Sequence, residues 1–136
     1  MGFDEVEDDA SVAWRVSVTA KSIDDLALAI SDHNPVHMSH LEAVGAGFKT
    51  RMLHGVGLLG IISSAVANKL PGAGSLLLKA DATYFKPAYI GDELECFLSV
   101  VKKYRINSTI RFHYSIHNGV NEKLATGTLT VMVPKS

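Results

Sequence analysis

The sequence is poor in cysteine and has no excess of charge of either sign. Cys96 is the single cysteine among 136 residues, so no disulfide forms within the chain and an oxidising compartment is not indicated. Lysine and arginine number 13, aspartate and glutamate 14, and the net charge is -1. Such a surface has no general attraction for nucleic acid or an anionic membrane, so we expect neither as a partner.

The sequence also lacks a long apolar run. Residues 1–10 are acidic and carry neither the basic start nor the apolar core of a signal peptide. Residues 56–70 are the most apolar stretch, but they are too short and too interrupted to cross a bilayer. We therefore expect a cytoplasmic protein, with residues 1–11 as a loosely held acidic lead-in and residues 12–136 as a single domain.

What is present is mainly the pattern of β-strands. Apolar residues alternate with other residues from Val12 to Ala20, which predicts a half-buried strand. Asn118-Gly119 is a strong hairpin signal, because both residues tolerate a positive φ. Further strands are predicted over residues 75–85, 93–104, 106–117 and 122–133.

A helical pattern interrupts these strands. Residues 55–70 are apolar on nearly every side, which predicts a buried helix that ends at Pro71. Shorter helices are predicted over residues 22–31, with Ser22 as the cap, and over residues 39–45. About five antiparallel strands curled around one buried helix make an α+β protein with a hot-dog fold. Such a sheet keeps an exposed edge, and pairing of two edges predicts a homodimer or a dimer of dimers.

The segment from Asp32 to His37 carries the most informative chemistry. Pro35 restricts the backbone, so we expect a rigid turn that aims the Asp32 carboxylate and the His37 imidazole at one point. A carboxylate and a neutral imidazole that share one water are suited to general acid–base catalysis. The alternative is structural, with Asp32 bonding its own turn and His37 as a satisfied buried histidine.

The pair His54-Gly55 begins the predicted buried helix. The first amides of a helix have no partners within the helix and lie at the positive end of its dipole. Because Gly55 has no side chain, a carbonyl oxygen could approach its N–H, which predicts an oxyanion-stabilising site. The alternatives are a close-packing glycine and a capping or packing role for His54. His37 and His40 lack a third ligand at a regular spacing, so we expect no metal.

Together these residues resemble the signature of the MaoC-like (R)-specific enoyl-CoA hydratase family. The resemblance covers residues 12–133, and one departure lies inside it: the family commonly has glycine immediately before the aspartate, where this chain has Ser31. The matching residues, in chain order, are Asp32-x-Asn34-Pro35-x-His37, Ala43, His54-Gly55, Phe85-Lys86-Pro87 and Ile90-Gly91-Asp92.

The resemblance implies a reaction and roles for four residues. Asp32 and His37 would activate the water that adds to a trans-2-enoyl thioester and gives an (R)-3-hydroxyacyl thioester, or would catalyse the reverse dehydration. Asn34 would brace the turn and contact His37, and the Gly55 N–H would bind the thioester carbonyl. No cofactor is implied, since coenzyme A or an acyl carrier is part of the substrate. A hot-dog acyl-CoA thioesterase and a non-catalytic acyl-thioester binding module are the alternatives.

Overall fold

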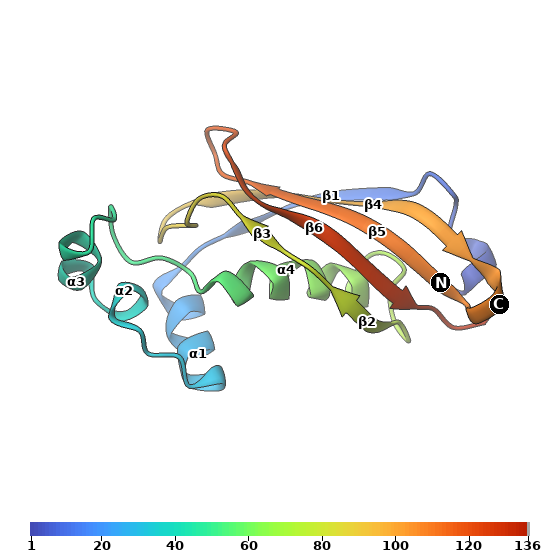
Figure 1. Cartoon of the computed structure of the whole chain (residues 1–136), viewed down its shortest axis with the longest axis horizontal. Helices are drawn as coiled ribbons and strands as arrows, with labels where there is room; N and C mark the ends of the chain where they lie inside the picture. The colour runs from blue at the N-terminus through green and yellow to red at the C-terminus, as the bar shows by residue number, and fades with distance from the viewer. Residues whose placement is uncertain (136) are drawn as a thin grey trace.

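The protein, described by a computed structural model over residues 1–135, is built on one antiparallel sheet (Figure 1). Ser136, the end of the predicted domain, lies outside the described residues. The sheet order is β1-β4-β5-β6-β2, and the short β3 also pairs with β6. The strands are β1 (Ser11–Ser17), β2 (Leu76–Ala80), β3 (Thr83–Tyr84), β4 (Glu93–Tyr104), β5 (Thr109–His117) and β6 (Lys123–Met132).

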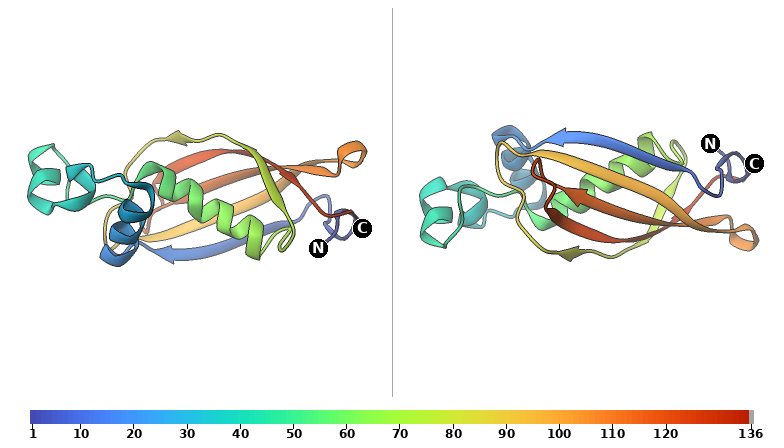
Figure 2. Two further views of the ribbon diagram at one scale, coloured as in Figure 1. Left: turned by 90° about the horizontal axis from the view of Figure 1, so that it is seen from below. Right: turned by 90° about the horizontal axis from the view of Figure 1, so that it is seen from above.

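Helix α4 (Gly55–Asn68) lies along the concave face of this sheet, as both views in Figure 2 show. The side of the helix that faces the strands is fully buried through Leu58, Ile62, Ala65 and Val66. The sheet contributes buried side chains on alternate positions, as a strand with one covered face requires. The predicted hot-dog fold, a curled sheet around one long helix, is therefore confirmed.

The prediction that α4 is buried on all sides is wrong for this single chain. The side that faces away from the sheet stays open, and Val56 is 55% exposed. An apolar groove of 320 Å³ runs between this side of α4, β1 and Leu26. The helix thus has more apolar surface than the rest of one chain covers.

Three short helices gather beyond the N-terminal end of α4 (Figure 1). They are α1 (Ala20–Ile30), α2 (Pro35–Met38) and α3 (His40–Gly45). Ser39 caps α3 as its side chain accepts from the Glu42 amide at 3.3 Å. The cap predicted for the first helix is wrong: Thr19 is the N-cap, and Ser22 completes a reciprocal capping box.

The N-terminal segment is not loosely held, and that prediction is wrong. Phe3 and Val6 are 5% and 1% exposed and belong to the core. Phe3, at the start of the 3-10 turn η1 (Phe3–Glu5), donates its amide to the Pro134 carbonyl at 2.9 Å. Two buried apolar side chains, together with backbone hydrogen bonds and the Asp4–Arg105 ion pair, therefore anchor the segment. The division of the chain at residue 12 stays a prediction.

Three strands depart from the predicted bounds by more than one residue. The strand predicted from Val12 to Ala20 is β1, which ends at Ser17, and Ala20 begins α1. The stretch predicted over residues 75–85 is divided into β2 and β3, with Asp81 and Ala82 outside both strands. The strand predicted from residue 106 begins at Thr109, because residues 105–107 form the 3-10 turn η2 and leave Ile106 98% exposed. The predicted hairpin is present between β5 and β6, but Asn121 rather than Gly119 has the positive φ, at 61°.

Cys96 lies on β4 with no exposed surface, and burial raises the pKa of its thiol to about 12. Its predicted place in the core is confirmed. Within residues 1–135, none of the helices combines the length and the hydrophobicity needed to span a bilayer.

Candidate active site

Ser31, the residue that follows the last residue of α1, has the left-handed conformation, with φ 58° and ψ 34°. This conformation costs an L-residue about 1–2 kcal/mol and costs glycine almost nothing. It occurs at the position where the resembled family commonly has glycine. Ser31 therefore adopts the conformation that glycine would, and the Asp32 amide donates to the Ala27 carbonyl at 3.1 Å across the helix end.

Asp32 and His37 are connected by a turn that its own side chains hold. The Asp32 Oδ1 accepts from the Asn34 amide at 3.2 Å, and the Asn34 Oδ1 accepts from the Val36 amide at 3.3 Å. Pro35 occupies the first position of α2, where its missing N–H has no consequence. Asn34 thus braces the turn, and it contacts His37 through its backbone carbonyl, which accepts the His37 amide at 2.9 Å.

The His37 side chain is 8% exposed and held at one nitrogen. Its Nδ1 lies 2.9 Å from the Met52 carbonyl oxygen. Because a carbonyl only accepts, Nδ1 carries a proton, and in the neutral ring Nε2 has the lone pair that can bind another partner. The tautomer that general-base chemistry requires is therefore set by the backbone of residue 52.

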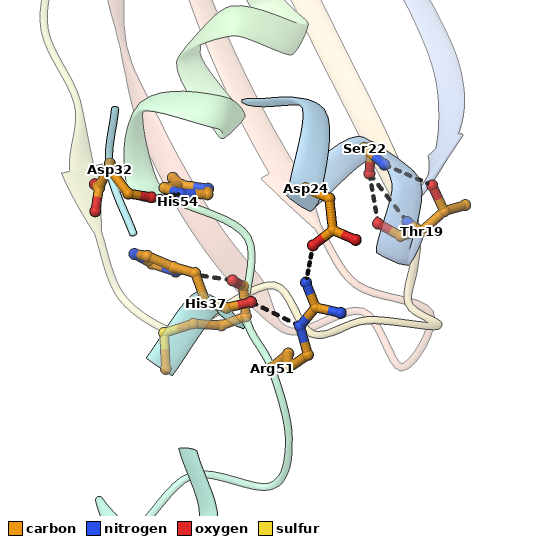
Figure 3. A network of polar contacts seen from close by, with 8 residues as sticks. Thr19, Ser22, Asp24, Asp32, His37, Arg51 and His54 are labelled. Atoms are coloured by element: carbon orange, nitrogen blue, oxygen red, sulfur yellow. Dashed lines mark hydrogen bonds and ion pairs between the residues drawn. The ribbon is translucent and has the colours of Figure 1, made fainter. Parts of the chain in front are cut away.

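Arg51 holds the backbone of the same histidine. Its Nε donates to the His37 carbonyl at 2.7 Å, while its Nη2 pairs with the Asp24 carboxylate on α1 (Figure 3). Arg51 therefore joins α1 to α2. The sequence gives no signal for this role, since the three residues are far apart along the chain.

His54 is a further member of the site, and its side chain is only 1% exposed. Its ring stacks on His37 with ring centroids 3.9 Å apart and an interplanar angle of 25°. Its Nε2 lies 2.9 Å from the Asp32 carbonyl oxygen (Figure 3). It caps no helix amide with its side chain. His54 therefore occupies the N-cap position and packs on His37, as the two structural alternatives predicted, and its contact with Asp32 was not predicted.

The side chains of Asp32, His37 and His54 come together closely. One ligand-type atom of each lies within 4.8 Å of the others. A single water can bridge two groups at such a separation with ordinary hydrogen bonds of about 2.8 Å each. These three side chains are also of the types that bind metal ions, and the expectation that no metal is bound stays a prediction. His40 lies outside this group, with its Nδ1 2.9 Å from the Thr50 hydroxyl oxygen.

His37 and Gly55 share a largely apolar cavity of 300 Å³. Gly55 is the first residue of α4, so its amide has no partner within the helix. A Cβ placed on Gly55 would lie 3.3 Å from the Cζ of Tyr84, so the tyrosine ring covers this glycine. The cavity is completed by Phe48, Met52, Leu53, Leu58, Tyr84, Phe85, Lys86, Pro87 and Ala88.

A larger hollow of 700 Å³ adjoins this cavity and shares Lys86 and Pro87 with it. Its wall carries charges of both signs, and Lys86 there is paired with Glu122. The imidazole and the helix-start amide are both in the smaller cavity, so the chemistry belongs there.

The chain matches the model of the MaoC-like domain over residues 5–121, most of its length. It belongs to the MaoC-like domain family. The resemblance seen in the sequence is confirmed. The match begins ahead of β1 and includes the anchored Val6, so the family pattern includes part of the N-terminal segment.

Proteins that are similar to this chain in sequence or structure have names that fit the family. A 3-hydroxybutyryl-CoA dehydratase of Methylorubrum extorquens is 26% identical over 98% of this chain and 84% of its own length. An (R)-specific enoyl-CoA hydratase of Rhodospirillum rubrum is 26% identical over 97% of this chain and 91% of its own length. The solved structure of an R-hydratase from Pseudomonas aeruginosa in the unliganded form is similar, with a TM-score of 0.93 at 27% identity, over 99% of this chain and 86% of its own.

The four residues predicted for the site thus fall at one end of α4. Asp32, Asn34 and His37 lie on the turn between α1 and α2, and Gly55 lies at the start of α4. Asp32 is beside the cavity rather than in its wall, whereas His37 and Gly55 line it. Their individual roles stay predictions.

Proposed function

We propose that this chain hydrates trans-2-enoyl thioesters to (R)-3-hydroxyacyl thioesters and catalyses the reverse dehydration. The observation that carries the proposal is the meeting of the Asp32 carboxylate with the His37 imidazole, whose Nδ1 is bound to the Met52 carbonyl, next to a cavity that also holds the Gly55 amide. The relatives named above, which carry both directions of this reaction in their names, support it.

Asp32 and His37 hold one water between them. The pair removes a proton from the water as its oxygen bonds to the β-carbon of the enoyl group. The π electrons of the double bond move toward the thioester carbonyl and give an enolate. The pair then returns a proton to the α-carbon, so that H and OH add across the double bond and no other reactant is consumed. General acid–base catalysis of this kind contributes about 10²–10⁴-fold.

The Gly55 amide binds the thioester oxygen while negative charge grows on it. This N–H is free of helix partners and lies at the positive end of the α4 dipole. A donor fixed in position before the reaction stabilises the enolate-like transition state more than the ground state. The acyl chain extends into the apolar cavity, and the thiol carrier, coenzyme A or a carrier protein, remains outside it as part of the substrate. No metal or redox cofactor takes part in this scheme.

The test follows the loss of enoyl-thioester absorbance with crotonyl-CoA, and then with longer enoyl-CoAs. We expect loss of absorbance without free thiol for the native chain, and a kcat lower by about 10²–10⁴-fold for Asp32→Asn and for His37→Gln. Free thiol released from a saturated acyl-CoA would make the chain a thioesterase. Binding of acyl-CoA without turnover of any length would make it a binding module.

We further propose that the working enzyme is a homodimer in the cytoplasm. The sheet ends in two edges, β1 and β2, and β2 exposes Leu76 and Leu78. The apolar outer side of α4 is also uncovered in one chain. A second copy would cover such surfaces, and light scattering coupled to gel filtration should give the mass of two or four chains.

A further inference from the structure

His54 takes no part in the scheme above, yet it is the most buried polar side chain of the site, at 1% exposed. We propose that His54 is a positioning residue that fixes the backbone of Asp32 and the ring plane of His37 relative to the Gly55 amide. The inference rests on the proposed function where activity is measured, and it has a readout that needs no activity.

The hydrogen bond from His54 to Asp32 determines the protonation of its ring. The Asp32 carbonyl oxygen only accepts, so the His54 Nε2 at 2.9 Å must carry the proton. The Nδ1 is then a buried lone pair, and no partner for it exists among residues 1–135. A buried acceptor without a partner costs about 1–3 kcal/mol. The ring thus keeps its donor on Asp32 although its other nitrogen is left unsatisfied.

Among residues 1–135, the other hydrogen bonds of Asp32 are to near neighbours in the chain, Ala27 and Asn34. Ser31 and Asp32 lie between α1 and α2, outside any helix or strand. The Asp32 amide is bonded to the end of α1, and its carbonyl is bonded to a side chain 22 positions away. His54 is therefore the contact that ties the carboxylate-bearing residue to the start of α4.

The stacking contact restrains His37 in a second way. The Met52 carbonyl fixes the edge of the His37 ring, and the face of His54 at 3.9 Å restricts its tilt. His54 does not line the cavity, whereas its neighbour Gly55 does. One residue thus orients both members of the acid–base pair, and the next residue supplies the amide that binds the carbonyl. Because His54 and Gly55 are adjacent in the chain, the peptide bond between them fixes how the acid–base pair lies relative to the amide that binds the carbonyl.

Three substitutions of His54 distinguish the effect of its hydrogen bond to Asp32 from the effect of its ring stacking on His37. In His54→Gln the amide nitrogen reaches about the place of Nε2, so the bond to Asp32 is kept. In His54→Asn the same amide reaches only the place of Nδ1, and the bond is lost. His54→Phe keeps an aromatic face on His37 but has no donor. Thermal unfolding of each variant shows which are folded, and kinetics are compared among those.

We expect kcat to fall about 100-fold in His54→Asn and His54→Phe, as for a catalytic group displaced by about 1 Å, with KM changed less than about threefold. His54→Gln should stay within about tenfold of the native kcat. Equal kcat values for the glutamine and asparagine variants, or a loss confined to KM, would overturn the proposal.

The second readout uses the native chain alone. Nitrogen-15 spectra of the imidazoles should show His54 protonated at Nε2 and His37 at Nδ1, with a slowly exchanging Nε2 proton on His54. A His54 protonated at Nδ1, or one that averages between the two forms, would overturn the proposal. A chain inactive on every enoyl-CoA would refute the proposed function. The nitrogen-15 spectra would then still test the role of His54 independently.

Discussion

Along α4, the middle of the helix packs on the sheet through aliphatic side chains, whereas its first residues lie among imidazoles, a guanidinium and backbone carbonyls. The middle is held by burial, and many neighbours share that task. The site end is held by a few directional bonds between residues far apart in sequence, such as His54 with Asp32 and Arg51 with Asp24, 22 and 27 positions apart. Substitutions in the first region should therefore change stability, and those in the second mainly geometry.

The largest expected effect is on stability in the core. Ile62→Ala removes a side chain with no exposed surface from the centre of α4, so we expect the free energy of unfolding to fall by about 2–5 kcal/mol. Ile106→Ala is the matched control, because this isoleucine is 98% exposed, and it should change stability by less than about 0.5 kcal/mol. Urea unfolding measures both free energies. Equal losses for the two variants would contradict the view that burial stabilises the middle of α4.

The next effect tests the arginine that joins α1 to α2. Arg51→Met removes the donors to the His37 carbonyl and the Asp24 carboxylate, so we expect a loss of about 1–3 kcal/mol and a lower kcat. Arg15→Met breaks a pair with Glu95 on the exposed face of the sheet and should cost less than about 1 kcal/mol with kcat unchanged. A larger loss of stability or of kcat from the Arg15 variant would reverse the ranking of the two regions.

A smaller effect separates two glycines of α4. Gly55→Ala would bring a methyl group to 3.3 Å from the Tyr84 ring, so the ring must shift by a few tenths of an ångström over the cavity. We expect kcat/KM to fall about tenfold, since small displacements at a site are costly. Gly60→Ala meets nothing within 4 Å and should stabilise the helix by about 0.5–1 kcal/mol without loss of activity. Steady-state kinetics and thermal unfolding of the pair give both results.

The smallest effect concerns the left-handed residue at the end of α1. Ser31→Gly relieves about 1–2 kcal/mol of backbone strain and adds freedom to the unfolded chain, so we expect a net gain of about 0.5 kcal/mol. The turn keeps its course, so kcat should stay within about twofold. A marked rise in kcat would mean that the serine displaces Asp32, and the two regions would then be less separate than described.

The sequence predicted the parts of this molecule that periodic burial determines. The long strand over residues 93–104 has the predicted bounds, and the helix that begins at Gly55 ends two residues before the predicted end, because many residues repeat one pattern. The Asp32 and His37 pair was found because it is local. Phe3 and Val6 gave no such pattern, and their anchoring depends on β-strand neighbours distant in the chain. His54 and Arg51 were missed as positioning contacts for the same reason, since each acts on residues far away in sequence.

The burial of Cys96 has a practical consequence for distinguishing hydration from hydrolysis. A thiol whose pKa is raised to about 12 is almost entirely protonated at neutral pH, and the surrounding core shields it from reagents. The folded chain therefore contributes no background when a chromogenic disulfide is used to count released coenzyme A. After addition of denaturant the same reagent should count one thiol per chain, which calibrates the protein concentration in the same cuvette.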